Sequence, residues 1–116
     1  MSRWILNEDG DPVLCEDLLT WAEWFERADR QVALDRVGPV TISTAFIGLD
    51  MSFGVGPPVL FETAVFAGLT GSEILRRYRT RLEALIGHEA VTEEVRAALP
   101  LNESPKLRVR DGSEDA

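Results

Sequence analysis

Val40-Thr41-Ile42-Ser43-Thr44 is the stretch that decides the fold, because its β-branched residues predict a strand whose two faces differ. Ile42 and Thr44 fall on one face, whereas Thr41 and Ser43 line the other face with hydroxyl groups. A strand with this alternation turns one side toward a core. We therefore expect it to belong to a sheet that is covered on one face.

This strand is predicted to extend from Val40 to Leu49, and two further strands are predicted beside it. Gln31–Val37 comes before it across a tight turn at Gly38-Pro39, and Val59–Ala67 follows a long loop. The second of these strands is apolar on both faces, so we expect it in the middle of the sheet or against a second subunit. The pattern thus predicts a homo-oligomer that forms through the sheet or through a helix face.

The N-terminal residues predict a hairpin followed by a helix. Arg3–Leu6 and Pro12–Leu14 are the two short limbs of the hairpin. Asp17–Ala28 shows apolar residues at helical spacing, with Glu16 and Asp17 in the first turn, where carboxylates favour the helix dipole.

A second helix is predicted to begin near Arg81, because Thr80-Arg81-Leu82-Glu83 has the form of a capping box, and to end at Pro100. Ile74–Arg79 would then be a short strand, although a helix that begins at Ser72 is an alternative. The expected buried positions of the second helix, with a slip at Gly87-His88, are Leu82, Leu85, Ile86, Val91, Val95, Ala98 and Leu99.

Length and composition fit one α+β domain. The chain has 116 residues, of which 45% are hydrophobic, and the strands and helices above give an antiparallel sheet of about four or five strands with two helices packed on one face. We assign residues 1–100 to this domain and residues 101–116 to a disordered acidic tail.

The charge and the cysteine content restrict the class of protein. With 20 acidic and 12 basic residues the net charge is −8, which opposes nucleic-acid binding. We expect no membrane segment, because no apolar run approaches ~18 residues, and a cytoplasmic location, because Met1 to Asp11 is charged. A lone Cys15 excludes an internal disulfide.

Few side chains are suited to catalysis or metal binding. The sequence has one histidine, one cysteine and one tyrosine, and we assign no metal, no cofactor and no catalytic residue. We expect His88 at a bend of the second helix, bonded to backbone or to a carboxylate such as Glu89. An alternative is a small enzyme that uses Glu62 or His88 as acid or base.

Glu62 requires a polar partner, because it interrupts the most apolar strand. Its partner is expected in the arginine cluster of residues 76–81, or it lines a pocket for a small anionic or nucleotide-like ligand. The loop Asp50–Pro58 is the best functional loop, because its glycines permit close approach and Phe53 offers a stacking surface. The predicted ligand-binding residues are Thr41, Ser43, Asp50, Phe53, Glu62, Tyr78, Arg79 and His88.

Several stretches resemble a family of small uncharacterised proteins of tailed bacteriophages and prophages. They are Trp4–Asn7 with Pro12-Val13, Asp17–Glu26 with Asp29-Arg30, Val40–Asp50, Gly56–Thr63, and the signature Arg77-Tyr78-x-Thr80-x-x-Glu83-Ala84-x-x-Gly87-His88. The resemblance implies no activity. It implies a setting, a viral product acting inside a bacterial host.

The function we expect is therefore that of a non-enzymatic, phage-encoded binding protein in the host cytoplasm. Such a counter-defence protein sequesters a small nucleotide-like signal or blocks a host protein. A small enzyme and a structural, self-associating accessory protein are the alternatives.

Deleting Leu101–Ala116 is predicted to leave the melting temperature unchanged, because the composition of this segment offers little to bury. A thermal melt of the shortened chain beside the full chain checks this. A drop of more than about 5 °C, on the order of 1 kcal/mol, means that the segment docks on the domain.

Overall fold

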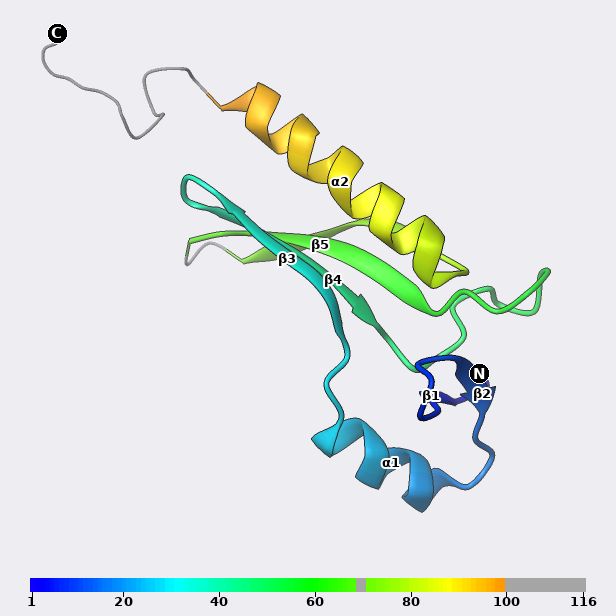
Figure 1. Ribbon diagram of the computed structural model, residues 1–116. Coiled ribbons are helices and arrows are strands. Elements are labelled where there is room, and N and C mark those ends of the chain that lie inside the picture. The colour runs from blue at the N-terminus through cyan, green and yellow to red at the C-terminus, as the bar shows by residue number, and fades with distance from the viewer. Residues whose placement is uncertain (69–70, 100–116) are drawn as a thin grey trace, which may run out of the picture.

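The computed structural model describes residues 1–68 and 71–99, and the predicted tail lies outside these residues. The described chain has the predicted α+β fold, with two antiparallel sheets and two helices (Figure 1). Its elements are β1 (Trp4–Leu6), β2 (Pro12–Leu14), α1 (Leu18–Arg27), β3 (Gln31–Val37), β4 (Val40–Phe46), β5 (Phe61–Ala67), β6 (Ser72–Tyr78) and α2 (Arg81–Ala98).

The main sheet has the strand order β3-β4-β5-β6, and every neighbouring pair is antiparallel. The apolar strand β5 lies between β4 and β6, so its predicted interior position is confirmed. The segment before α2 is strand β6, as predicted, and not the first part of a longer helix. β1 and β2 form the predicted hairpin as a separate two-stranded sheet.

The two helices take different places. α2 crosses one face of the main sheet and contacts all four of its strands, whereas α1 packs against β1 at one end of the sheet (Figure 1). Trp24 of α1 reaches the core there, with its ring edge-on to Phe46 at 5.8 Å between ring centroids. None of the helices in the described chain is long and apolar enough to cross a membrane.

The face of the main sheet turned away from α2 is called the open face below. Strand register places its side chains in three rows across β3, β4, β5 and β6. The rows are Gln31, Ala45, Glu62 and Arg77; Leu34, Ser43, Ala64 and Ile74; and Arg36, Thr41, Phe66 and Ser72.

Asp17 is the N-cap of α1 and Glu16 precedes it, so the prediction that both lie in the first turn of the helix is wrong. Its carboxylate accepts hydrogen bonds from the hydroxyl of Thr20, at 2.5 Å, and from the Thr20 amide, at 2.9 Å. These bonds stabilise the ionised form and lower the pKa of Asp17. A carboxylate that satisfies a free amide directly is a stronger start signal than one acting on the dipole.

The capping box of α2 is confirmed, since Thr80 and Glu83 bond to each other's backbone amides at 3.2 and 3.1 Å. Of the positions predicted to be buried on the second helix only Val91 is buried, whereas Val95 and Leu99 are half-buried and Ala98 is exposed. The predicted face is wrong throughout the N-terminal half. Leu82, Leu85 and Ile86 are 67%, 41% and 63% exposed. The residues of α2 that are buried against the sheet are Ala84, Gly87, His88, Val91 and Thr92.

The close packing of Tyr78 under Gly87 explains why α2 turns its small residues, and not its leucines, toward the sheet. A Cβ atom on Gly87 would lie 2.2 Å from the tyrosine ring, a distance that no side chain tolerates. Helix and sheet therefore approach through small residues, and the large apolar side chains of α2 are left outside.

Gly87→Ala is predicted to destabilise the protein by about 2 kcal/mol, although alanine favours helices by about 1 kcal/mol. Urea melts measure the change. In a Tyr78→Leu background the same substitution should cost little or stabilise, because the clashing ring is gone. An equal cost in both backgrounds contradicts the packing account.

Candidate functional site

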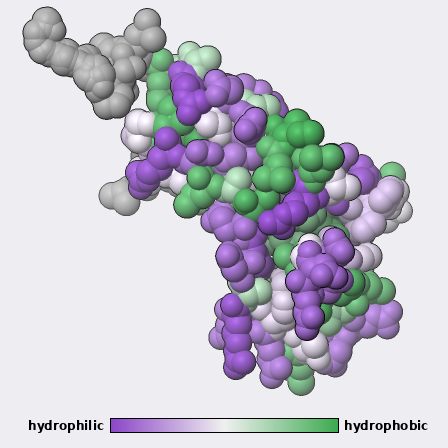
Figure 2. Space-filling model, viewed as in Figure 1, coloured by the Kyte–Doolittle hydropathy of each residue, from purple (hydrophilic) through white to green (hydrophobic). Residues whose placement is uncertain are grey.

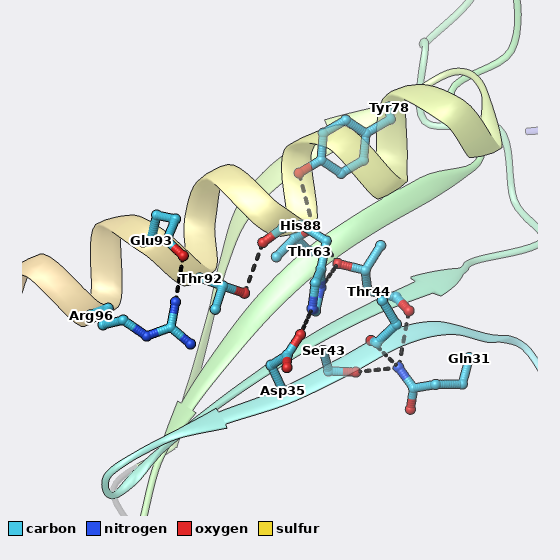
Figure 3. A network of polar contacts seen from close by, with 11 residues as sticks. Gln31, Asp35, Ser43, Thr44, Thr63, Tyr78, His88, Thr92, Glu93 and Arg96 are labelled. Carbon is cyan, nitrogen blue, oxygen red and sulfur yellow. Dashed lines mark hydrogen bonds and ion pairs between the residues drawn. The ribbon is translucent and has the colours of Figure 1, made fainter.

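A chain of hydrogen bonds, buried at its centre and exposed at its Asp35 end, joins α2 to the main sheet (Figure 3). His88 is 2% exposed, and both of its ring nitrogens have partners. Nδ1 lies 2.7 Å from the hydroxyl of Thr44, and Nε2 lies 2.8 Å from a carboxylate oxygen of Asp35. The imidazole thus bridges β3 and β4, and its predicted partner, Glu89, is not the one that it uses.

The chain continues across the remaining strands. Thr44 lies 2.5 Å from Thr63, oxygen to oxygen, and Thr63 lies 2.9 Å from the hydroxyl of Tyr78. Each strand of the main sheet therefore contributes one member, and α2 contributes His88. We call these five residues, Asp35, Thr44, Thr63, Tyr78 and His88, the polar chain.

If the imidazole is neutral, every hydrogen bond of the polar chain can be donated in the same direction, from Tyr78 toward Asp35. The Nε2–H group donates to ionised Asp35, and Nδ1 accepts from Thr44. Thr44 can then accept from Thr63, which in turn accepts from the phenol of Tyr78. Buried hydroxyls that each give and receive one bond reinforce one another in a low-dielectric interior.

The order Asp35–His88–Thr44 has the connectivity of an acid, a base and a hydroxyl nucleophile. The hydroxyl oxygen of Thr44, however, is in a residue that is 0% exposed and is already bonded to Thr63. A substrate atom has no route to this oxygen in the packed arrangement. The polar chain therefore fixes the position of α2 and does not present a nucleophile.

Three other predicted residues lie together at the loop of residues 50–58. Arg79 donates from Nε to the Pro57 carbonyl at 2.9 Å and from Nη2 to the Val55 carbonyl at 3.1 Å. Phe53 is 74% exposed and has a φ of 56°, a left-handed conformation that is strained for a bulky residue. Asp50 organises the loop, and a cavity of about 410 Å³ beside it is lined by Met1, Ser2, Asp50, Phe53 and Gly54.

Asp50 is held ionised by backbone amides. One of its oxygens accepts from the amides of Val59, at 2.9 Å, and Ser52, at 2.8 Å. The Val59 and Ser52 amides together lower the pKa of Asp50 from its ordinary value of 3.8. The carboxylate thus closes the loop on itself.

The remaining predicted residues, Thr41, Ser43 and Glu62, lie on the open face. Glu62 pairs with Arg77 on the neighbouring strand, with 3.4 Å between Oε1 and Nε, so the prediction of a partner in the arginine cluster of residues 76–81 is confirmed. The two side chains are 23% and 38% exposed, so this ion pair contributes about 0–1 kcal/mol rather than the several expected of a buried pair. Ser43 accepts a hydrogen bond from Gln31 at 2.9 Å.

The eight predicted residues are thus divided among the polar chain, the loop and the open face. Sequence reasoning did not assign Asp35, Thr44 and Thr63 to a site. Thr44 and Thr63 carried a usable signal, because a hydroxyl on a core-facing strand position needs a partner. Asp35 carried none, since an acidic residue on an edge strand is ordinary.

Comparison with protein-family models, with curated proteins and with solved structures finds no match. The resemblance to bacteriophage proteins therefore stays a prediction.

Asp50→Asn is predicted to flatten the dependence of stability on pH in acid. Because the folded pKa of Asp50 is lowered, its contribution is present above about pH 4 and is lost as the pH falls through the folded value. Urea melts at neutral pH and near pH 3 should show the variant less stable than the parent at neutral pH and closer to it in acid. Glu23→Gln on α1 is the control, and a gap of equal size at both pH values contradicts the role of Asp50.

Proposed function

We propose that the protein is a non-enzymatic binding protein, encoded by a bacteriophage, that acts in the host cytoplasm by binding and blocking a host protein. The exposed side of α2 is the proposed binding surface. The observation that carries this proposal is the outward position of three large apolar side chains on a helix that the polar chain holds in place.

Leu82, Leu85 and Ile86 form the outer ridge of α2, because residues three and four apart share one side of a helix. All three are exposed in the described structure, at 67%, 41% and 63%. Figure 2 shows apolar side chains gathered over the N-terminal half of this helix. Contiguous exposed apolar surface of this kind is typical of protein interaction sites.

A cavity of about 450 Å³ adjoins the outer ridge. It lies between α2 and the edge strand β3, and its lining residues are Ala33, Asp35, Leu85, Ile86, His88 and Glu89. Its walls are mostly apolar, and one oxygen of the Asp35 carboxylate bonds to His88. The cavity therefore suits an apolar anchor from a partner, such as a leucine or an aromatic side chain.

The charges near the ridge indicate the chemistry of the partner. Glu89 and Glu93 continue the same side of α2 beyond Ile86, although Glu93 is paired with Arg96, and the whole chain has a net charge of −8. An apolar patch bordered by lysines or arginines is the complementary surface, since opposite potentials steer association and exclude other partners.

The alternative target that the sequence predicts, a nucleotide-like ligand, has weaker support. Arg79 is occupied by the Val55 and Pro57 carbonyls, and Glu62 by Arg77. A cavity of about 730 Å³ near Arg79 is also bordered by carboxylates of the β1–β2 turn, which repel phosphate. The lining residues that decide this are Glu8, Asp9, Asp11, Arg30, Arg79 and Arg81.

Ile86→Asp is predicted to abolish capture of the host protein while leaving the melting temperature unchanged, because Ile86 is exposed in the free protein. The partner is identified from lysate by its presence with the parent and its absence with the variant. Titration calorimetry with the purified partner then measures affinity, with an expected loss of at least about 2 kcal/mol, or roughly thirtyfold.

Leu19→Asp is the matched control, since Leu19 is 73% exposed on α1, and it should bind as the parent does. Equal affinity of Ile86→Asp and the parent contradicts the proposed surface. A thermal-shift screen with nucleotides tests the alternative target, because a ligand at a hundred times its dissociation constant stabilises the folded protein by about 2.7 kcal/mol. Such a shift with a nucleotide contradicts the proposed protein target.

A further inference from the structure

The open face carries large apolar side chains that nothing in the described chain covers. Leu34 is 58% exposed, Ile74 48% and Phe66 41%. They come from three different strands, yet register brings them to one surface. The buried core, by contrast, receives none of its residues from the open face.

The middle row of the open face is the most apolar. Leu34 and Ile74 stand at its two ends, on the edge strands, and Ser43 and Ala64 lie between them. Because Ser43 and Ala64 have short side chains, another layer can pack closely against the centre of the sheet. Two sheets packed face to face lie about 10 Å apart and interdigitate side chains of this size.

We propose that a second copy of this chain covers the open face, so that two main sheets pack against each other in a two-fold dimer. The interface of such a dimer uses the same patch on both copies and must be complementary to itself. The outer ridge of α2 lies on the other side of the sheet. It remains free for another partner, so the dimer does not depend on the proposed function.

Self-complementarity follows from the register. A two-fold axis that lies between the sheets runs either along the strands or across them. With either axis the middle row of one copy faces the middle row of the second copy. The apolar residues at the ends of the two rows then contact each other. Leu34 then meets either Ile74 or Leu34 of the second copy, and the small residues meet each other.

The charges of the open face favour a second copy over a different occupant. Its three rows hold Arg36, Arg77 and Glu62, a net charge of +1 on a chain of −8, so this face does not carry the acidic excess that makes copies of the chain repel each other. Both rotations place each of these charges opposite an uncharged residue. Glu62 also enters the interface already paired with Arg77.

Sedimentation equilibrium of the full chain at micromolar concentration tests the dimer. The expected mass for the parent is twice 12.9 kDa. Leu34→Glu and Ile74→Glu are each expected to raise the dimer dissociation constant at least about tenfold, because an unpaired charge enters the apolar row. Both residues are exposed in the single chain, so neither substitution disturbs its core.

Ile86→Glu is the matched control, an exposed isoleucine replaced in the same way on α2, and it should remain a dimer. The melting temperature of the parent should rise with protein concentration, and that of Leu34→Glu should begin to rise only at higher concentration. A parent that sediments at 12.9 kDa overturns the proposal. Dissociation by Ile86→Glu, with Leu34→Glu and Ile74→Glu still dimeric, overturns it as well, because the interface is then the α2 ridge.

Discussion

The hydrogen bond between His88 and Thr44, at 2.7 Å, is the contact on which the rest of the structure depends. It links α2 to the central strand β4, and Thr63, Tyr78 and Asp35 extend the link to both edges of the sheet. Buried polar groups must keep their partners, because an unsatisfied one costs about 1–3 kcal/mol. α2 therefore cannot rotate to bury more apolar surface without breaking this chain.

The surface of the protein follows from that restraint. With His88, Gly87 and Ala84 turned inward, the large apolar residues of the first turns of α2 face outward. The open face of the sheet also exposes large apolar side chains. Apolar side chains are therefore exposed on both outer layers of the described domain, and the proposed partner surface on α2 and the proposed dimer would each cover one of these layers.

Much of the fold could be predicted from sequence, because it depends on local signals. The alternation in β4, the double apolarity of β5 and the Thr80–Glu83 capping box each specify an element from neighbouring residues. The orientation of α2 could not be predicted, because Leu82 and Leu85 have the spacing of a buried stripe. The contact that turns them outward, Tyr78 against Gly87, joins two elements and has no local sequence signal. Of the predicted site residues, Tyr78 and His88 meet in the polar chain through Thr63 and Thr44, whose role alternation alone does not disclose.

The free energy of unfolding of Thr44→Val, measured by urea denaturation beside the parent, tests the central role of the polar chain most directly. Valine keeps the shape of threonine and removes the hydroxyl that joins His88 to Thr63. A loss of about 1–3 kcal/mol with an unchanged denaturant slope is expected, because Nδ1 of His88 loses its hydrogen-bond partner inside the core and the hydroxyl of Thr63 loses one of its two partners. A variant as stable as the parent, or more stable, contradicts it, since packing alone would then hold α2 on the sheet.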